Sequence, residues 1–169
     1  MKDQKAASSK KISDYFPLIA LICVALFGAL AICYSVQGGV LRWMHYFMGL
    51  IFMLFALLKL FDISGFADGF QRYDLIAKRS RYYALSYPFI ELLLGLGYLS
   101  MWAPVFIYII TIILMLIGSL GVILGLKKGL DIYCPCMGTV LKVPLSTVTL
   151  TEDLGMGISA LIMLIIHFS

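Results

Sequence analysis

The sequence predicts an all-α membrane protein, a bundle of about five transmembrane helices. Three observations lead to this fold class: the composition, the length of the apolar stretches and the placement of the basic residues. Apolar residues make up 62% of the 169 and charged residues 13%, with a mean hydropathy of +1.01. Soluble domains carry about 25% charged residues, so this chain lacks the polar surface that a globule in water needs.

The apolar stretches are long enough to cross a bilayer. A helix needs about 20 apolar residues to span roughly 30 Å of hydrocarbon. The stretches of this length are residues 16–35, 43–61, 83–101, 104–126 and 150–168. Little chain remains for a domain outside the membrane, so the lipid bilayer is the main partner that the composition predicts.

The first stretch is interpreted as a retained span and not as a signal peptide. Its apolar run of about 20 residues exceeds the 7–15 that are typical of a signal peptide, and no small-residue cleavage site follows. We therefore expect a basic cytoplasmic N-terminus (1–15) and a first span (16–35), followed by the four spans of residues 43–168.

Lysines and arginines are concentrated in alternate loops. Of the thirteen, all but Arg42 and Lys59 fall in the N-terminal segment or in the loops after the second and fourth spans. This bias predicts a multi-pass protein of the bacterial inner (cytoplasmic) membrane with its N-terminus in the cytoplasm. Because the charges are divided among loops and form no basic face, nucleic acid is not expected as a partner.

A Cys134-Pro135-Cys136 motif lies in the loop between the fourth and fifth spans. Two thiols separated by one rigid residue suit thiol–disulfide exchange, because a disulfide across one residue is strained and therefore labile. The same thiolates suit a soft metal ion such as Cu(I) or mercury. No cofactor is certain from the sequence, and a structural accessory subunit without chemistry of its own is a third alternative.

Charged residues in or near the spans are the other candidates, because such residues are costly in a membrane. Glu91 lies inside the third span, whereas Lys59 lies near the end of the second and could either snorkel to the surface or pair with Glu91. We expect Glu91, Lys59 and Asp62 to form polar support near Cys134 and Cys136. Further acids on the same face would complete a vestibule open to the cytoplasm: Asp68, Asp131, Glu152 and Asp153.

Several local patterns give weaker expectations. Segment 63–82 reads as an amphipathic helix, either on the membrane surface or tucked against the bundle. Gly121 and Gly125 form a GxxxG that would allow close helix approach, and Thr149–Glu152 resembles a capping box at the start of the last span. Cys23 and Cys33 are interpreted as small apolar residues that fill space in the first span. His45 and His167 are interpreted as isolated interfacial residues.

Three motifs carry a resemblance to a known family. The run Leu57–Asp62 followed by Gly65–Phe70 resembles the LK…F/D…GF signature of DoxX-like membrane proteins, and Pro88, Glu91 and Gly95 resemble their P-x-x-E-x-x-x-G helix. The motif at 134–139 followed by Pro144-Leu145-Ser146 is similar to the MauE branch.

The resemblance covers about residues 43–168 and implies a four-helix membrane core, to which residues 16–35 add an extra N-terminal span. It also implies a protein described, with related DoxD proteins, as redox-associated. It implies a role in the maturation of periplasmic enzymes of the methylamine-utilisation type, with a thioredoxin-like or periplasmic protein partner. Any enzymatic activity would be of the thiol–disulfide oxidoreductase kind, carried by Cys134 and Cys136.

Overall fold

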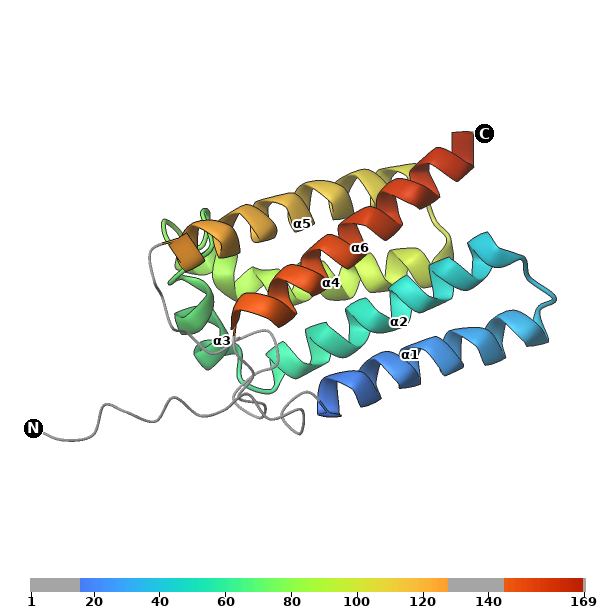
Figure 1. Ribbon diagram of the computed structural model, residues 1–169, viewed down its shortest axis with the longest axis horizontal. Helices are drawn as coiled ribbons and strands as arrows, with labels where there is room; N and C mark the ends of the chain where they lie inside the picture. The colour runs from blue at the N-terminus through green and yellow to red at the C-terminus, as the bar shows by residue number, and fades with distance from the viewer. Residues whose placement is uncertain (1–15, 128–144, 169) are drawn as a thin grey trace, which may run out of the picture.

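The computed structural model describes residues 16–127 and 145–168, which form six helices and no strands (Figure 1). The helices are α1 (Phe16–Ser35), α2 (Val40–Leu60), α3 (Ile63–Phe70), α4 (Arg81–Ser100), α5 (Pro104–Lys127) and α6 (Leu145–Phe168). The predicted all-α membrane bundle is confirmed. Cys134, Cys136 and Asp131 lie outside the described residues.

Within the described ranges, four helices are long and apolar enough to cross a membrane: α1, α2, α5 and α6. The remaining expected span, residues 83–101, corresponds to α4, which is as long as α1 at 20 residues. Its composition is more polar because it carries Arg81 and Glu91 among several tyrosines. It nevertheless packs along α2 inside the bundle (Figure 1).

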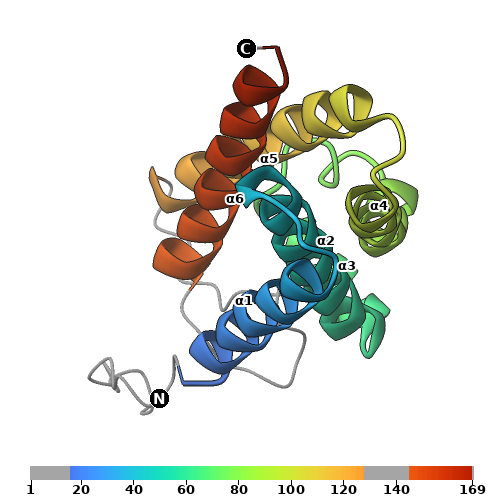
Figure 2. The same ribbon diagram turned by 90° about the vertical axis from the view of Figure 1, so that its right-hand side faces the viewer.

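The helix α2 is the centre of the arrangement. It packs against α1 on one side and α4 on the other, while α5 and α6 form a second tight pair (Figure 2). Glycines allow α2 and α4 to approach closely: a Cβ built on Gly49 would lie 3.0 Å from the carbonyl oxygen of Gly95. Large apolar side chains cover the outside of the bundle, as lipid contact requires.

Two helix starts test the sequence-based boundaries. The helix α5 begins at Pro104, as expected, because proline suits the first helical position. The capping-box interpretation of Thr149 is wrong: α6 already begins at Leu145, so Thr149 lies inside the helix. The apolar window of α6 does start at Thr149, which explains why the hydropathy pattern placed the span there.

The segment after α2 folds back against the bundle. Asp62 caps α3 by accepting a hydrogen bond from the backbone N–H of Gly65 at 2.9 Å. Phe66 and Phe70 are then buried against Tyr87 of α4, and Tyr73 is buried beside Phe70. Of the two predicted alternatives, the connecting helix tucked against the bundle is therefore the one observed. It covers only Ile63–Phe70 of the expected 63–82, and turns follow it.

Candidate functional site

The site is built around a buried ion pair between α2 and α4. Lys59 Nζ donates a hydrogen bond to Glu91 Oε1, and each residue is 2% exposed. Lys59 Nζ also lies 5.6 Å from the ring centroid of Phe66 and 5.2 Å from that of Tyr87. The predicted pairing is confirmed. Snorkelling of Lys59 to the surface is wrong, because α3 covers the end of α2 and closes that route.

Three further acids belong to the same region. Asp74 comes from the turn after α3, and Glu152 and Asp153 come from the second turn of α6. Asp153 is buried and lies close enough to interact electrostatically with Glu152, Lys59, Glu91 and Asp74. We call Asp74, Glu91, Glu152 and Asp153 the acidic cluster. Lys59 acts electrostatically on Glu152 and Asp153, and Lys78 acts on Asp74.

The acidic cluster contains three buried oxygens that lack a hydrogen-bond partner within the described chain: Asp74 Oδ2, Glu91 Oε2 and Glu152 Oε2. Buried polar atoms are normally satisfied, and an unpaired buried charge is costly. Such carboxyls favour binding a proton or a donor group over remaining as bare anions. The chemistry that the cluster offers is therefore proton uptake and release.

Local backbone geometry places Asp74 in the cluster. Its Oδ1 accepts hydrogen bonds from the backbone N–H groups of Ile76 at 2.9 Å and Ala77 at 2.8 Å. A Cβ on Gly121 would lie only 3.0 Å from the carbonyl oxygen of Tyr73, so α5 approaches this turn because Gly121 has no side chain. The predicted GxxxG contact of Gly121 is thus with a turn and not with a helix.

Two groups of this turn titrate outside their ordinary ranges. Burial raises the pKa of the Asp74 carboxyl, and the hydrogen bonds from Ala77 and Ile76 offset only part of that effect. Burial, followed by the charge of Asp153, raises the pKa of the Tyr73 hydroxyl well above its usual value. Tyr73 therefore stays protonated at physiological pH.

The other predicted site residues do not belong to the acidic cluster or lie outside the described residues. Asp62 caps α3, and Asp68 forms an exposed ion pair with Arg81 at 2.7 Å, so neither contributes a buried group to the cluster. The predicted roles of Cys134 and Cys136 stay predictions, as both lie outside the described residues. The described part of the chain holds no group of three metal-ligating side chains.

The acidic cluster lies toward the end of the bundle where α5 finishes and α6 starts (Figure 1). Lys127 and Leu145, the described residues on either side of segment 128–144, both lie at this end. The cysteine motif is therefore connected to the bundle at the end that contains Lys59 and α3.

A second polar network lies toward the opposite end of the bundle. His45 Nδ1 bonds to the carbonyl oxygen of Leu41 at 2.9 Å, and His45 Nε2 bonds to the Tyr108 hydroxyl at 2.7 Å. A carbonyl only accepts, so Nδ1 carries the proton of the neutral ring and Tyr108 donates to Nε2. Tyr98 donates to Thr111 Oγ1 at 3.2 Å nearby. His45 is thus buried and bonded, and its interpretation as an isolated interfacial residue is wrong.

Sequence reasoning missed two buried polar residues, Asp74 and His45. Asp74 lies in a polar segment, and its residue type alone does not distinguish it from exposed acids. The hydrophobic spacing of Phe70, Tyr73 and Ala77 around it was the available signal, because all three face the bundle. His45 finds its partner 63 residues away, a separation that no local motif reveals.

Comparison with known proteins gives one family. The model of the methylamine utilisation protein MauE matches residues 17–166 and therefore includes α1 as well as the bundle that follows it. The comparisons with curated proteins and with solved structures each found no match. The family match covers most of the chain and agrees with the helical membrane fold. This multi-pass membrane protein belongs to the MauE family.

Proposed function

We propose that the protein is a redox-associated accessory of the bacterial inner membrane, with its N-terminus in the cytoplasm, and that Cys134 and Cys136 carry out thiol–disulfide exchange. A thioredoxin-like protein is the proposed partner, and maturation of periplasmic enzymes of methylamine utilisation is the proposed purpose. The supporting observation is the buried Lys59–Glu91 pair with its acidic cluster at the end of the bundle where the cysteine segment joins α5 and α6.

Thiol–disulfide exchange between Cys134/Cys136 and the two cysteines of the partner needs no further oxidant or reductant. The thiolate of one cysteine attacks the partner's disulfide, and a mixed disulfide forms while one partner thiolate leaves. The second cysteine then attacks the mixed disulfide, so that this chain holds the Cys134–Cys136 disulfide and the partner holds two thiols. The reverse sequence reduces this chain. Each attack requires a deprotonated thiol, and the acidic cluster supplies carboxyls that accept and return protons.

The experiment is an alkylation assay on protein in phosphatidylcholine nanodiscs. Cys23→Ser and Cys33→Ser remove the two described cysteines, so that a maleimide–polyethylene glycol gel shift reports only Cys134 and Cys136. After oxidation with diamide, Cys134 and Cys136 should be unreactive toward the maleimide, and reduced thioredoxin should restore two labels, because a strained disulfide is readily reduced. In Cys134→Ser or Cys136→Ser, a mixed disulfide should accumulate. If reduced thioredoxin leaves the Cys134–Cys136 disulfide intact, the exchange function is wrong.

Membrane sidedness is tested on the same cysteines. A membrane-impermeant maleimide should label Cys134 and Cys136 in inside-out vesicles and not in intact spheroplasts. Labelling from the outer face would overturn the proposed orientation. Protection of both thiols by Cu(I) at equimolar concentration, without any exchange with thioredoxin, would favour the soft-metal alternative over thiol exchange.

A further inference from the structure

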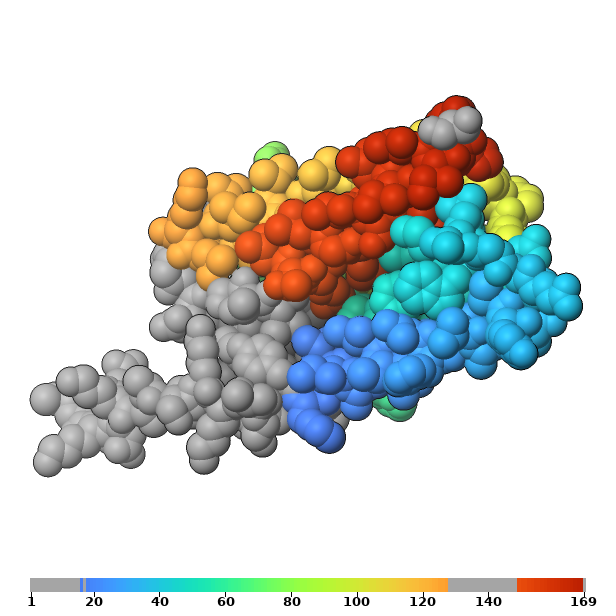
Figure 3. Space-filling model, turned by 45° about the vertical axis from the view of Figure 1, so that its right-hand side comes forward, coloured from blue at the N-terminus to red at the C-terminus, as the bar shows by residue number. Residues whose placement is uncertain are grey.

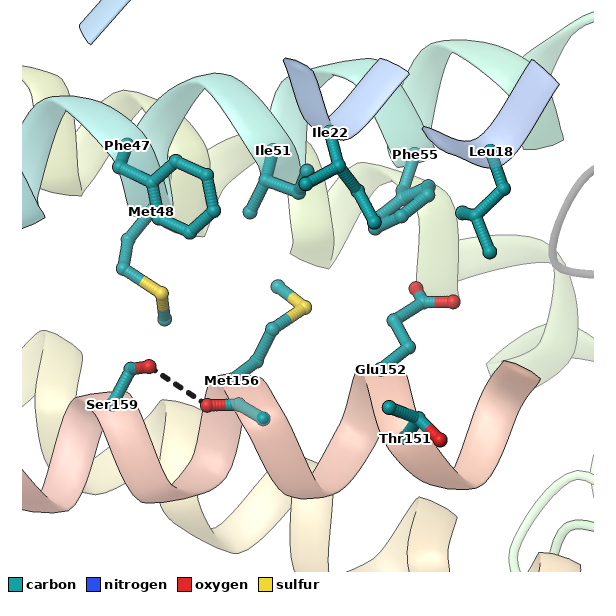
Figure 4. Close-up of a pocket in the computed structure, with 11 residues that line it drawn as sticks. Leu18, Ile22, Phe47, Met48, Ile51, Phe55, Thr151, Glu152, Met156 and Ser159 are labelled. Carbon is teal, nitrogen blue, oxygen red and sulfur yellow. Dashed lines mark hydrogen bonds between the residues drawn. The ribbon is translucent and has the colours of Figure 1, made fainter. Parts of the chain in front are cut away.

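A cavity of about 360 Å³ lies between α1 and α6, with α2 as its floor (Figure 4). It exists because α1 packs on α2 whereas α6 packs mainly on α5. Figure 3 shows this face, where α2 is visible between the two outer helices. The volume falls within the range of about 300–1,000 Å³ that is usual for small-molecule sites. We call this space the α1–α6 cleft.

The lining of the cleft is apolar along most of its length. Ile22 comes from α1, Ile51 and Phe55 come from α2, and Met156 comes from α6. All four lie in helices that are apolar enough to span the membrane. An occupant would therefore enter from the lipid phase, and its body has to be apolar to replace contact with hydrocarbon.

One end of the cleft is polar. The Glu152 carboxyl points into the space beside Phe55 and Leu18, whereas Met48 and Ser159 lie at the other end (Figure 4). Ser159 Oγ already donates to the carbonyl oxygen of Gly155 at 2.8 Å. Glu152 Oε2, in contrast, is buried and has no hydrogen-bond partner within the described chain. Glu152 is thus the group in the cleft that still requires a donor.

The charges around Glu152 indicate which hydrogen-bond donor an occupant of the cleft should carry. Among the described residues, Lys59 is the cation that acts electrostatically on Glu152, and Glu91 already holds it. Asp153 follows Glu152 directly and adds a second buried acid. A positively charged head would pair with the Glu152 carboxylate, whereas an anionic head would be repelled by it.

The direction of the cleft matches the orientation of a membrane amphiphile. Glu152 lies near the start of the α6 span, close to the membrane surface, and Ser159 lies seven residues further in, about 10 Å along the helix. A polar head at Glu152 would leave its chain pointing toward the middle of the bilayer. We propose that the α1–α6 cleft binds a single-chain amphiphile with an ammonium head, paired with Glu152. This site shares Glu152 with the acidic cluster, but binding of the amphiphile does not depend on thiol exchange.

The test uses the full chain in phosphatidylcholine nanodiscs and radiolabelled decylamine as the probe. We expect a saturable component of one decylamine per protein, above the partition measured in empty nanodiscs. Decanol should compete more weakly than unlabelled decylamine, and decanoate should compete least. Absence of a saturable component, or competition by decanoate equal to that by decylamine, would overturn the proposal.

Variants locate the binding. Glu152→Gln should weaken decylamine binding about tenfold or more, because glutamine cannot carry the negative charge that pairs with the ammonium head. Ile22→Phe should reduce binding by filling the cleft from α1, whereas Ile19→Phe, on the same helix but outside the cleft, should leave it unchanged. Equal binding by the wild type and Ile22→Phe would show that decylamine binds elsewhere and would overturn the assignment.

Discussion

Lys59 on α2 and Glu91 on α4 form an ion pair in which both residues are 98% buried, because Phe66 and Tyr87 enclose the ammonium group. A buried pair of this kind is weak evidence for stability, since desolvation offsets much of the attraction. Removing one member, however, leaves an uncompensated charge. The pair therefore belongs both to the packing of α2 on α4 and to the acidic cluster. Its contribution to stability and its contribution to thiol exchange need separate measurements.

Substitution of one or both partners separates these roles. Lys59→Met alone should lower the free energy of unfolding by about 3–5 kcal/mol, whereas Lys59→Met with Glu91→Gln should restore much of that loss. Unfolding in mixed detergent micelles measures both. In the surface pair with Asp68, Arg81→Gln is the matched control and should cost about 1 kcal/mol or less.

The same double variant tests the polar support of the thiols. If the pair assists exchange, the double variant should fold stably and still exchange with thioredoxin more slowly than the wild type. Exchange at the wild-type rate in a stable double variant would show that Lys59 and Glu91 have a structural role only.

The network at the other end of the bundle makes a different prediction. Tyr108→Phe removes the donor to His45 Nε2 and should lower the free energy of unfolding by about 1–3 kcal/mol, because a buried acceptor is left unsatisfied. Replacing His45 by Phe in the same background should cost less than it does in the wild type. A double-mutant cycle measures this coupling, and losses that add within about 0.5 kcal/mol would contradict the hydrogen bond as assigned.

The sequence was sufficient for the helices and for part of the site. Apolar stretches predicted the spans because membrane crossing imposes a length, and Glu91 and Lys59 were recognisable because charges are rare in such stretches. Their partnership followed from similar depth. Asp74 and His45 were not recognisable, since their burial depends on how a turn packs against Gly121 and on a tyrosine from another helix.

The start of α6 shows the limit of local motifs. Thr149 and Glu152 fit the spacing of a capping box, and a hydropathy window begins there. The helix nevertheless starts earlier because nothing in residues 145–148 prevents helical backbone after Pro144. Because α6 begins at Leu145, Glu152 and Asp153 lie inside the helix and within the bundle, near Lys59 and Glu91.

Glycine substitutions test the close contacts that hold the acidic cluster. A Cβ on Gly118 would lie 2.8 Å from Asp153 Oδ2, and a Cβ on Gly121 would meet the backbone of Tyr73. Gly118→Ala and Gly121→Ala should each be destabilising, by about 1–3 kcal/mol for overpacking. Gly155→Ala is the control, because its Cβ would meet nothing within 4 Å and alanine favours the helix by up to about 1 kcal/mol. Equal effects at all three positions would contradict this packing.

The pH dependence of stability tests the environment of Asp74. Because burial raises the pKa of its carboxyl above the ordinary value of 3.8, the folded chain holds this proton more tightly than the unfolded chain does. The stabilisation by Asp74 is therefore complete below about pH 3.8 and is lost as the pH rises through the raised pKa. Asp74→Asn removes the titration, while its side-chain oxygen still accepts from Ile76 and Ala77. The free energy of unfolding of the variant, relative to the wild type, should increase from pH 4 toward neutrality. Parallel curves for the two proteins would show that Asp74 is not desolvated in the folded state.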